Sequence, residues 1–541
     1  MERYIIRSRQ VFTGLRECPQ PAAIVVADGM IERVLPRDYE GFPDCGGLPV
    51  KDYGDALIIP SFLDAHTHMF SGAVDASDYV CDTLGECGSE AACAERIAAY
   101  AKEHPNQRRI RGAGWFVGAW NDAPLPDKRS LDAVISDRPV YLLCADSHSM
   151  WLNSKAIEEA GFSESFAVEN GEVCRDAEGR LTGLFIEPAA YAPAMEKYME
   201  FSASEMLEIH RHFQQELARC GISAVSEMFA DDYTRETKER YLQLVRLDRA
   251  EGLRAQIFLY TKLFDYTDFT LFSAMRREVK SAHVHIAGVK GFIDGVTETY
   301  TGLLLEPYTD RPGTCGEGLP LHPRERMQEE IAAANAAGIQ VRLHCIGDGA
   351  VRMALDMYEE SERQNGRRDL RNTIEHIENI HPDDLARFAA LDVIASMQPY
   401  HLTLSNGAKV WRLGEKRCQL EFPIRSIYDC GGRIAIGTDY PVVTINPFAT
   451  IYAAATRCDD AGLPTGCNAD TQKLPLSVIL KAYTQGAARV YHADGVMGTI
   501  EAGKFANLLV LTDNLFEIPA ERIRNTKVAV NYFEGREVYH E

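Results

Sequence analysis

The sequence lacks a long hydrophobic run. No stretch approaches the roughly 18 apolar residues that a membrane-spanning helix needs. The first residues, Met1–Arg7, also lack the apolar region of a secretory signal. We therefore expect a cytoplasmic protein with no membrane partner.

Paired cysteines and an excess of positive charge are lacking as well. The 14 cysteines are scattered singly, with no Cys-x-x-Cys pair, which argues against a zinc ribbon or a disulfide framework. The chain has 57 lysines and arginines against 79 aspartates and glutamates, a formal charge of −22. Nucleic acids and anionic membranes bind basic surfaces, so neither is expected as a partner. A small-molecule substrate is the partner that we expect.

What the sequence does contain is an apolar run that ends in two histidines. Residues 57–63 are followed by Asp64-Ala65-His66-Thr67-His68. Alternate residues of a β-strand share a face, so His66 and His68 are expected to point the same way from the end of a strand. Two neutral imidazoles on one face form half of a divalent-metal site. The pair alone is a weak signal, because solvated or core histidines give the same pattern.

Both ends of the 541-residue chain have strand-like patterns. We expect residues 1–58 to form a small antiparallel sheet that residues 491–541 complete, with residues 59–490 as the main domain of the chain. Residues 75–200 mix helical and strand patterns and are predicted to be an inserted subdomain. That insertion is either a lid or wall over a pocket or a purely structural addition.

From about residue 200, strand-like and helix-like stretches alternate. Together with the strand before His66 there are eight strand candidates. Such alternation is typical of a parallel sheet covered by helices. We therefore predict an α/β protein with a (β/α)8 TIM-like barrel and a large insertion after its first strand. The other seven candidates are 222–226, 255–260, 285–290, 339–344, 372–376, 393–397 and 433–437.

Polar side chains close several of these strands. Lys290 ends the fourth strand, His344 the fifth and His376 the sixth, and Asp439 follows the eighth. The C-terminal ends of barrel strands meet at one rim, where active sites lie. Each residue alone has an ordinary alternative, such as a solvated lysine or a capping aspartate. The ordered set, with the two histidines after the first strand, predicts a metal site at this rim.

A second His-x-His pair offers a comparison within the chain. His283 and His285 lie at the start of the fourth strand, so they are expected at the opposite face of the barrel, where residues serve stability. His210 and His212 lie two apart in a helical stretch and therefore face apart. We predict structural roles for both pairs.

Nine stretches of the chain carry a resemblance to a known family. They are 60–68 (PSFLDAHTH), 112–115 (GAGW), 151–154 (WLNS), 289–295 (VKGFIDG), 343–348 (LHCIGD), 374–376 (IEH), 395–399 (ASMQP), 437–441 (GTDYP) and 498–504 (GTIEAGK). With them the sequence resembles the amidohydrolase superfamily of metal-dependent hydrolases, and within it amidohydrolase family 3, the YtcJ-like group. The resemblance implies a distorted barrel, a large insertion after the first strand and a β-sandwich from both chain ends. A homodimer is also an expectation from the family.

The resemblance also implies a set of metal ligands. Carried over residue by residue, the ligands are His66, His68, His344, His376 and Asp439. They would hold one or two divalent ions, for which zinc is expected, although manganese, iron or cobalt would fit as well. Lys290 stands where related enzymes have a lysine carboxylated by CO₂, which bridges two metals through two anionic oxygens. The alternative is an unmodified Lys290 that pairs with a substrate anion beside a single metal.

Two positions depart from the family pattern. Asn507 stands where an aspartate is usual, and Glu227 where an aspartate is common after the second strand. Neither is an implied ligand, so these differences concern the substrate and the packing rather than the class of reaction.

The reaction implied is hydrolysis of an amide-type C–N bond, in an N-substituted formamide, an N-acyl compound or a cyclic amide. Metal ions lower the pKa of bound water from near 16 to about 7, which gives hydroxide at neutral pH. Asp439 would take the proton of the water and pass it to the leaving nitrogen. A second metal or the imidazole of His401 would polarise the scissile carbonyl. The alternative for His401 is an ordinary surface residue.

Substrate selection is expected from the insertion and from one loop of the barrel. The insertion offers Trp115, His148 and Trp151, and the loop Thr297–Thr301 beyond the fourth strand offers Tyr300. Aromatic groups there suit an apolar or aromatic substituent on nitrogen. For each of them core packing is the alternative.

Two other functions fit parts of the pattern. One is a mononuclear metal-dependent deaminase of a heterocyclic amine, which would leave Lys290 unmodified. The other is a degenerate barrel that binds a small molecule without turnover. Intact ligands at the strand ends argue against the second, because drift would erode them first.

Overall fold

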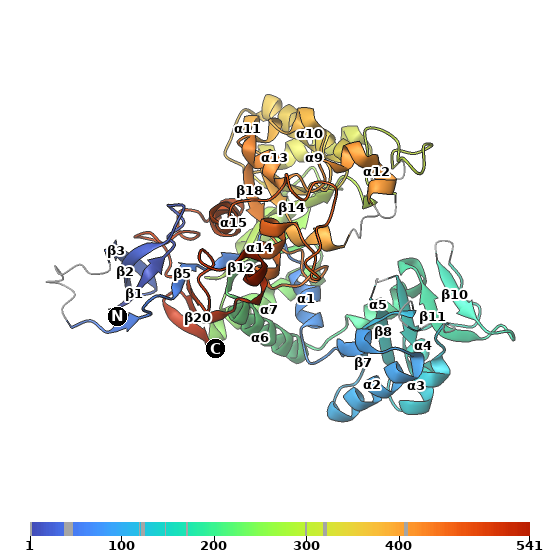
Figure 1. The fold of residues 1–541 in the computed structure, drawn as a ribbon. Helices are drawn as coiled ribbons and strands as arrows, with labels where there is room; N and C mark the ends of the chain where they lie inside the picture. Colours follow the sequence, from blue (N-terminus) through green and yellow to red (C-terminus); the bar gives the residue numbers. More distant parts are fainter. Residues whose placement is uncertain are drawn as a thin grey trace. The chain divides into compact units, whose positions relative to one another are not determined.

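A computed structural model describes residues 3–36, 47–117, 120, 125–145, 148–168, 171–297, 300–316, 322–404 and 409–541. The chain divides into two compact units (Figure 1). Unit 1 consists of Met1–Met69 with Gln214–Glu541, and unit 2 consists of Phe70–Phe213. The predicted domain bounds, 1–58 with 491–541, 59–490 and the insertion 75–200, stay predictions.

A curled sheet of eight parallel strands is the main element of unit 1. Each strand overlaps one of the eight predicted stretches, so the predicted α/β class is confirmed, with a curled parallel sheet. Closure of this sheet into a complete (β/α)8 barrel stays a prediction. In sheet order the strands are β6 (Phe62–Leu63), β12 (Ile222–Asp231), β13 (Gln256–Lys262), β14 (Val284–Phe292), β15 (Gln340–Cys345), β16 (Thr373–His376), β17 (Ile394–Met397) and β18 (Arg433–Ile436).

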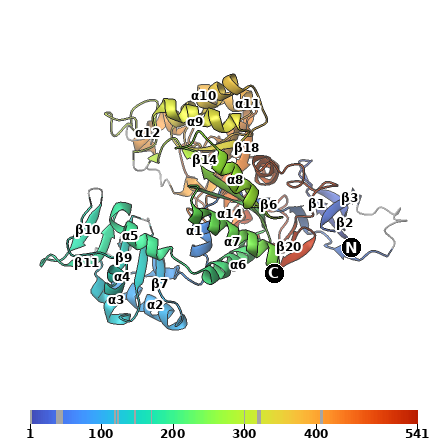
Figure 2. The same cartoon turned by 180° about the vertical axis from the view of Figure 1, so that it is seen from behind.

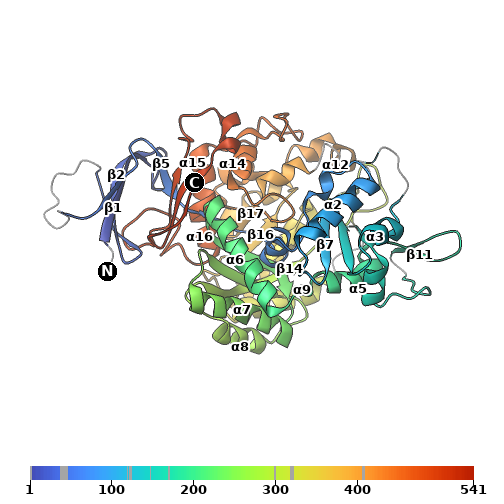
Figure 3. The ribbon, with the colours of Figure 1, turned by 90° about the horizontal axis from the view of Figure 1, so that it is seen from below.

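Helices follow most of these strands and lie along the outside of the sheet (Figures 2 and 3). They include α7 (Arg235–Glu251), α8 (Thr270–Glu278), α9 (Arg324–Ala336), α10 (Asp348–Asn365), α11 (Arg387–Ala390) and α13 (Ile424–Asp429). Local sequence explains their limits. Helix α7 begins after Thr234, whose hydroxyl accepts a hydrogen bond from the Thr237 N–H at 3.1 Å. It ends at Gly252, whose φ of 74° suits glycine.

Hydrogen bonds join the first and last strands of the curled sheet just beyond their ends. The Asp439 N–H donates to the carbonyl of His66 at 2.7 Å, and the His68 N–H donates to the carbonyl of Tyr440 at 2.7 Å. A glycine makes this approach possible, because a Cβ atom at Gly437 would lie 2.4 Å from the backbone nitrogen of His66. The two segments with predicted ligands are thus held side by side.

The two chain ends share a second sheet in unit 1. Its order is β21-β20-β19-β5-β1-β2-β3, with β4 (Val50–Asp52) beside β1. The strands are β1 (Arg3–Val11), β2 (Gln20–Ala27), β3 (Met30–Leu35), β5 (Leu57–Pro60), β19 (Leu508–Leu511), β20 (Val528–Phe533) and β21 (Arg536–His540). The two-layer sandwich expected there stays a prediction.

The apolar run 57–63 serves both sheets, which the sequence pattern did not show. Its first half, β5, pairs with β19 and β1, whereas its second half, β6, pairs with β12. The change falls at Pro60, which has no N–H to donate to a ladder. The Ser61 N–H still bonds to Asn507, but the Phe62 N–H bonds to the carbonyl of Gly221, each at 3.0 Å.

Unit 2 has a sheet and a core of its own. The sheet order is β10-β11-β9-β8-β7. Its elements are β7 (Ile110–Trp115), β8 (Val140–Cys144), β9 (Ser149–Leu152), β10 (Glu172–Arg175), β11 (Leu181–Ile186), α2 (Glu90–Glu103), α3 (Lys128–Val134), α4 (Ser154–Glu159) and α5 (Pro188–Tyr198). Trp115, Trp120 and Trp151 pack together in the core. The predicted role as a lid or wall stays a prediction.

Among the helices of the described residues, none is both long and apolar enough to span a membrane.

Candidate metal centre

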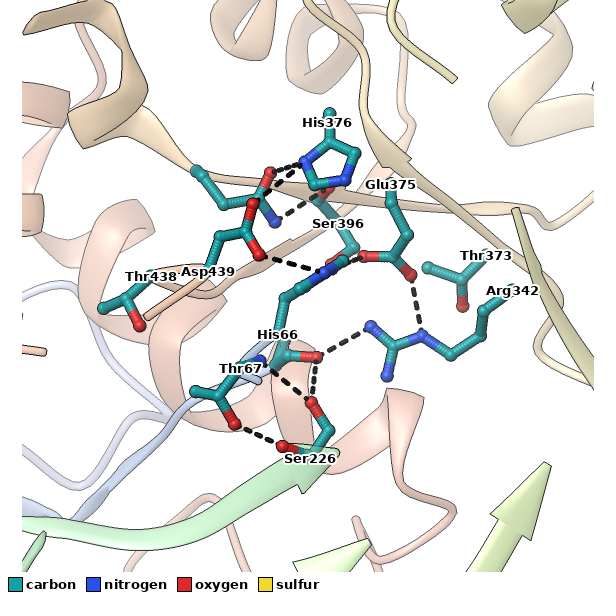
Figure 4. A network of polar contacts seen from close by, with 12 residues as sticks. His66, Thr67, Ser226, Arg342, Thr373, Glu375, His376, Ser396, Thr438 and Asp439 are labelled. Carbon is teal, nitrogen blue, oxygen red and sulfur yellow. Dashed lines mark hydrogen bonds and ion pairs between the residues drawn. The ribbon is translucent and has the colours of Figure 1, made fainter. Parts of the chain in front are cut away.

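His66 and His68 follow β6 and direct their rings at one oxygen of the Asp439 carboxylate. Figure 4 shows His66 beside this carboxylate. The distance from Asp439 Oδ1 is 3.3 Å to His66 Nε2 and 3.1 Å to His68 Nε2. His66 is fully buried, and the His68 side chain keeps 23% of its exposure. The three residues therefore offer ligand atoms around one point.

The other oxygen of Asp439 faces two more histidines. Asp439 Oδ2 lies 3.9 Å from Nδ1 of His376, the last residue of β16, and 3.5 Å from Nε2 of His401. His401 belongs to the short helix Pro399–Thr403 that follows β17, and its ring stacks on that of His376 at 5.9 Å. His401 is only 6% exposed, so it is not a surface residue. A second group of ligand atoms, from His376, His401 and Asp439, thus shares the carboxylate with the first.

The backbone is unusual at two of these residues. His376 has a φ of 73° and Asp439 a φ of 64°. Residues with side chains avoid this region, and each such position costs of order 1–3 kcal/mol. Strain of this kind persists where the surroundings fix it. The two strained residues lie at or just beyond the ends of the strands on either side of β17, and their side chains lie 3.9 Å apart.

Buried acceptors fix the orientation of two rings. Glu375 Oε2 accepts a hydrogen bond from His66 Nδ1 at 2.7 Å, and Gln398 Oε1 accepts one from His376 Nδ1 at 2.9 Å. The proton of each ring is then on Nδ1, which leaves the lone pair on Nε2. The atom that His376 offers to a metal is therefore Nε2, not the Nδ1 that lies 3.9 Å from Asp439 Oδ2. For Glu375 the sequence offers one signal: a charged residue inside a buried strand, which is rare unless it is paired.

The charges in the centre suit a divalent cation. Burial lowers the pKa of His66 to about 4, and it lowers the pKa of His376 well below its ordinary value. Burial alone would raise the pKa of Asp439, but the surrounding imidazoles more than offset this and hold that pKa well below its ordinary value. The neutral imidazoles of His66 and His376 beside an ionised carboxylate resemble the donor set of zinc sites.

Two buried ring nitrogens of the centre make no hydrogen bond among the described residues. They are His66 Nε2 and His401 Nε2, which face the Asp439 carboxylate at 3.3 and 3.5 Å. Buried polar atoms are nearly always satisfied, so atoms left over in one cluster call for an ion or a ligand. The residues present therefore fit a divalent metal.

Lys290 and His344 lie beside the two groups rather than within them. Burial lowers the pKa of Lys290 to about 8, and its Nζ lies 5.2 Å from the centre of the Phe292 ring. The ring of His344 is 4.5 Å from that of His376, and burial lowers its pKa to about 3. The Nε2 of His344 donates to the carbonyl of Gly295 at 3.1 Å, which leaves Nδ1 as its possible ligand atom.

Comparison with known proteins identifies the family. The model of the amidohydrolase family matches residues 50–539. The chain belongs to this family. It is a hydrolase that acts on carbon–nitrogen bonds, and the predicted resemblance is confirmed.

Relatives of this amidohydrolase match nearly its whole length. It is 24% identical to the amidohydrolase YtcJ of Bacillus subtilis (strain 168), over 98% of each chain. It is 25% identical to an N-substituted formamide deformylase of Arthrobacter pascens, over 95% of this chain and 94% of that protein. An uncharacterized metal-dependent hydrolase from Pyrococcus horikoshii OT3 has the same fold, with a TM-score of 0.78 at 23% identity over 96% of this chain and 99% of that one.

The buried carboxylate of Asp64, which the sequence pattern does not single out, joins the segments that contain His66 and Asp439. Asp64 Oδ1 accepts hydrogen bonds from the backbone N–H groups of His66 at 3.2 Å and Thr438 at 2.9 Å. Its Oδ2 accepts one from the Thr438 hydroxyl at 2.6 Å. Asp64 therefore fixes the backbone of His66 and that of Thr438, the residue directly before Asp439.

Three of the residues predicted to contact substrate lie outside this cluster. Trp115 is a core residue of unit 2, 1% exposed, and His148 is exposed in unit 2 with its Nδ1 3.0 Å from Glu187. The Tyr300 hydroxyl donates to Asp310 at 2.7 Å. Residues 298 and 299 of the predicted loop lie outside the described residues. Substrate contacts by these residues stay predictions.

Proposed function

We propose that this amidohydrolase cleaves an amide-type C–N bond in a small substrate of the N-substituted formamide, N-acyl or cyclic amide class. One observation carries the proposal. Asp439 presents one carboxylate oxygen to His66 and His68 and the other to His376 and His401, in a buried setting. The name of the Arthrobacter pascens relative, a formamide deformylase, supports the substrate class.

We propose His66, His68, His376 and Asp439 as metal ligands, with His344 through its Nδ1. Zinc fits this set of nitrogen and carboxylate donors. When bound, such an ion lowers the pKa of a water molecule from near 16 to about 7 and polarises a carbonyl. Glu375 and Gln398 keep two of the imidazoles in the tautomer that ligation needs.

Asp439 is the residue that we propose to move the proton. Its low pKa keeps the carboxylate ionised, so it can accept the proton of the attacking water. The same carboxylate then delivers that proton to the leaving nitrogen. His401, with a buried Nε2 that has no hydrogen-bond partner among the described residues, is placed to donate to the carbonyl oxygen of the substrate as negative charge develops there.

We propose that Lys290 becomes carboxylated. With a pKa lowered to about 8, a sizeable fraction of its amine is neutral near pH 7.5 and can attack CO₂. The new N–C bond gives a carbamate and releases one proton. A carbamate would supply two anionic oxygens for a pair of ions, whereas an unmodified Lys290 beside one ion would favour the deaminase alternative.

A substrate screen with the metal-loaded protein tests the proposal. N-formyl, N-acyl and cyclic-amide compounds are compared with heterocyclic amines, and formate, carboxylate and ammonia are measured as products. We expect hydrolysis of at least one amide, its loss on chelation and its return with zinc. Turnover of heterocyclic amines alone, with ammonia released, would replace the proposal by the deaminase. Full activity of His344→Ala on an amide would remove His344 from the ligand set.

A further inference from the structure

An arginine without any exposed surface lies inside the barrel. Arg342 is in the middle of β15, two residues before His344, and is 0% exposed. Its Nε donates to Glu375 Oε1 at 2.7 Å, and its Nη2 donates to the carbonyl of Ala65 at 2.7 Å (Figure 4). The guanidinium also lies over the ring of Tyr260, 4.6 Å from its centre.

Both contacts of Arg342 lead to the same metal-ligand candidate. Glu375, also 0% exposed, uses its second oxygen to accept the hydrogen bond from His66 Nδ1 at 2.7 Å. Ala65 is the residue directly before His66. The Nε of Arg342 therefore holds the carboxylate that accepts the hydrogen bond of the His66 ring. Its Nη2 holds the backbone directly before His66.

We propose that Arg342 is a positioning residue for the metal centre, which holds Glu375 in the orientation that fixes the His66 ring and its tautomer. This inference rests on the proposed function, because it takes His66 as a metal ligand. A guanidinium is a planar fork of donors, so it fixes the plane of a carboxylate. The carboxylate in turn keeps the proton of His66 on Nδ1 and its lone pair on Nε2.

Stability is a poor alternative explanation for this arginine. Removing two charges from water costs nearly as much as their attraction returns, and buried ion pairs can often be replaced by apolar residues without loss. A barrel interior that needed only packing would hold an apolar residue at this position. Here Arg342 holds Glu375, and Glu375 accepts the hydrogen bond of His66. An apolar residue at position 342 could not hold the carboxylate in this way.

The chain offers a matched control in Arg457. It is 1% exposed and donates to the carbonyls of Phe422 at 3.4 Å and Glu421 at 3.2 Å and to Asn468 Oδ1 at 2.5 Å. None of these partners is a metal-ligand candidate. Replacing Arg457 therefore measures the cost of losing a buried arginine without disturbing the His66 ring.

The first experiment measures zinc affinity by competition with a chromophoric chelator, in the absence of substrate. Arg342→Met is expected to weaken zinc binding about 10–100-fold, the usual effect of losing an outer partner of a metal ligand. Arg342→Lys, which keeps the charge but loses the fork, is expected to lie between Arg342→Met and the wild type. Arg457→Met is expected to bind zinc as the wild type does. Unchanged zinc affinity in Arg342→Met, or an equal loss in Arg457→Met, would overturn the inference.

A second variant separates positioning from a general effect on the fold. If Arg342 acts through Glu375, then adding Arg342→Met to Glu375→Gln should weaken zinc binding much less than it does in the wild-type background. If the two substitutions instead weaken zinc binding by factors that multiply, Arg342 does not act through Glu375. Thermal unfolding of the metal-free proteins checks the fold, and if Arg342→Met does not fold, Arg342→Lys decides by the same criterion.

The outcomes also separate this inference from the proposed function. If no amide is hydrolysed but Arg342→Met loses zinc while Arg457→Met does not, only the proposed function fails. If the wild type hydrolyses an amide and Arg342→Met keeps its zinc affinity, only this inference fails. A wild type that binds no zinc would overturn both.

Discussion

The same barrel contains two His-x-His pairs with opposite surroundings. His66 and His68 follow the end of β6, whereas His283 and His285 stand at the start of β14. His283 is held by carboxylates on both sides, with Nδ1 2.5 Å from Asp248 and Nε2 3.1 Å from Glu534. Neither atom is left for a metal.

The second histidine of each pair shows the same contrast. His285 Nε2 lies 2.9 Å from the amide oxygen of Gln256 and its ring stacks on Phe258, whereas His68 Nε2 faces the shared carboxylate of Asp439. Spacing alone states only that two imidazoles lie on one side of a strand. At the C-terminal end of a strand such rings meet polar side chains from other strands of the sheet. At the N-terminal end they meet residues that stabilise the fold.

The largest effect is expected at the carboxylate that the two ligand groups share. Asp439→Asn removes the proton acceptor and should lower kcat/KM for the best amide of the screen by about 10²–10⁴-fold. Asp248→Asn, the corresponding change beside His283, should leave kcat/KM as in the wild type. Steady-state kinetics with zinc content measured on the same samples checks both, and an active Asp439→Asn would refute the role of this residue.

The second-largest effect is expected on zinc affinity, in which the two His-x-His pairs should differ. His66→Ala removes an imidazole from the centre and should weaken zinc affinity by at least about 100-fold, the upper end of the cost of losing an outer partner. His285→Ala should bind zinc as the wild type does. Equal zinc affinities in the two variants, measured by chelator competition, would remove the distinction between the pairs.

A smaller effect, on stability alone, is expected at the other pair. His283→Asn loses a buried hydrogen-bond network with Asp248 and Glu534, which should lower the free energy of unfolding by about 1–3 kcal/mol. Zinc content should not change. Urea unfolding at pH 6 measures the cost, and a His283→Asn protein that keeps its stability but loses zinc would reverse the assignment.

The pH dependence of that stability difference sharpens the test. Burial alone would lower the pKa of His283, but Glu534 and Asp248 more than offset this and raise it above 6.5. The stability that His283 contributes is therefore fully present below pH 6.5 and is lost as the pH rises through its folded-state pKa. Burial would raise the pKa of Asp248, but His283 lowers it below 3.8, so that contribution is lost at low pH. The difference between wild type and variant should be widest between pH 3.8 and 6.5, and a difference that grows above pH 7 would contradict this.

The strands were predictable because each is a local apolar run. In a sheet covered by helices both faces are buried, so a strand such as β13, with six of its seven residues buried, stands out in the sequence. The order of the runs then placed Lys290, His344, His376 and Asp439 at strand ends. The exception is the run 57–63, whose division between two sheets depends on the distant partners Asn507 and Gly221.

The remaining parts of the centre depend on contacts that no local pattern reports. His401 reaches Asp439 because a short helix follows Gln398. The left-handed backbone at His376 and Asp439 does not follow from their residue types. Arg342 and Glu375 meet across β15 and β16, 33 positions apart. A charged residue in a buried strand signals that such a partner exists but does not identify it.

The central claim is that histidines from separate strands and one aspartate gather at one metal centre. X-ray absorption at the zinc edge of the zinc-loaded wild type tests this most directly. We predict nitrogen and oxygen neighbours at about 2.0–2.2 Å, with the outer scattering of several imidazoles. Sulfur neighbours at about 2.3 Å, or a spectrum identical to that of zinc in buffer, would contradict it.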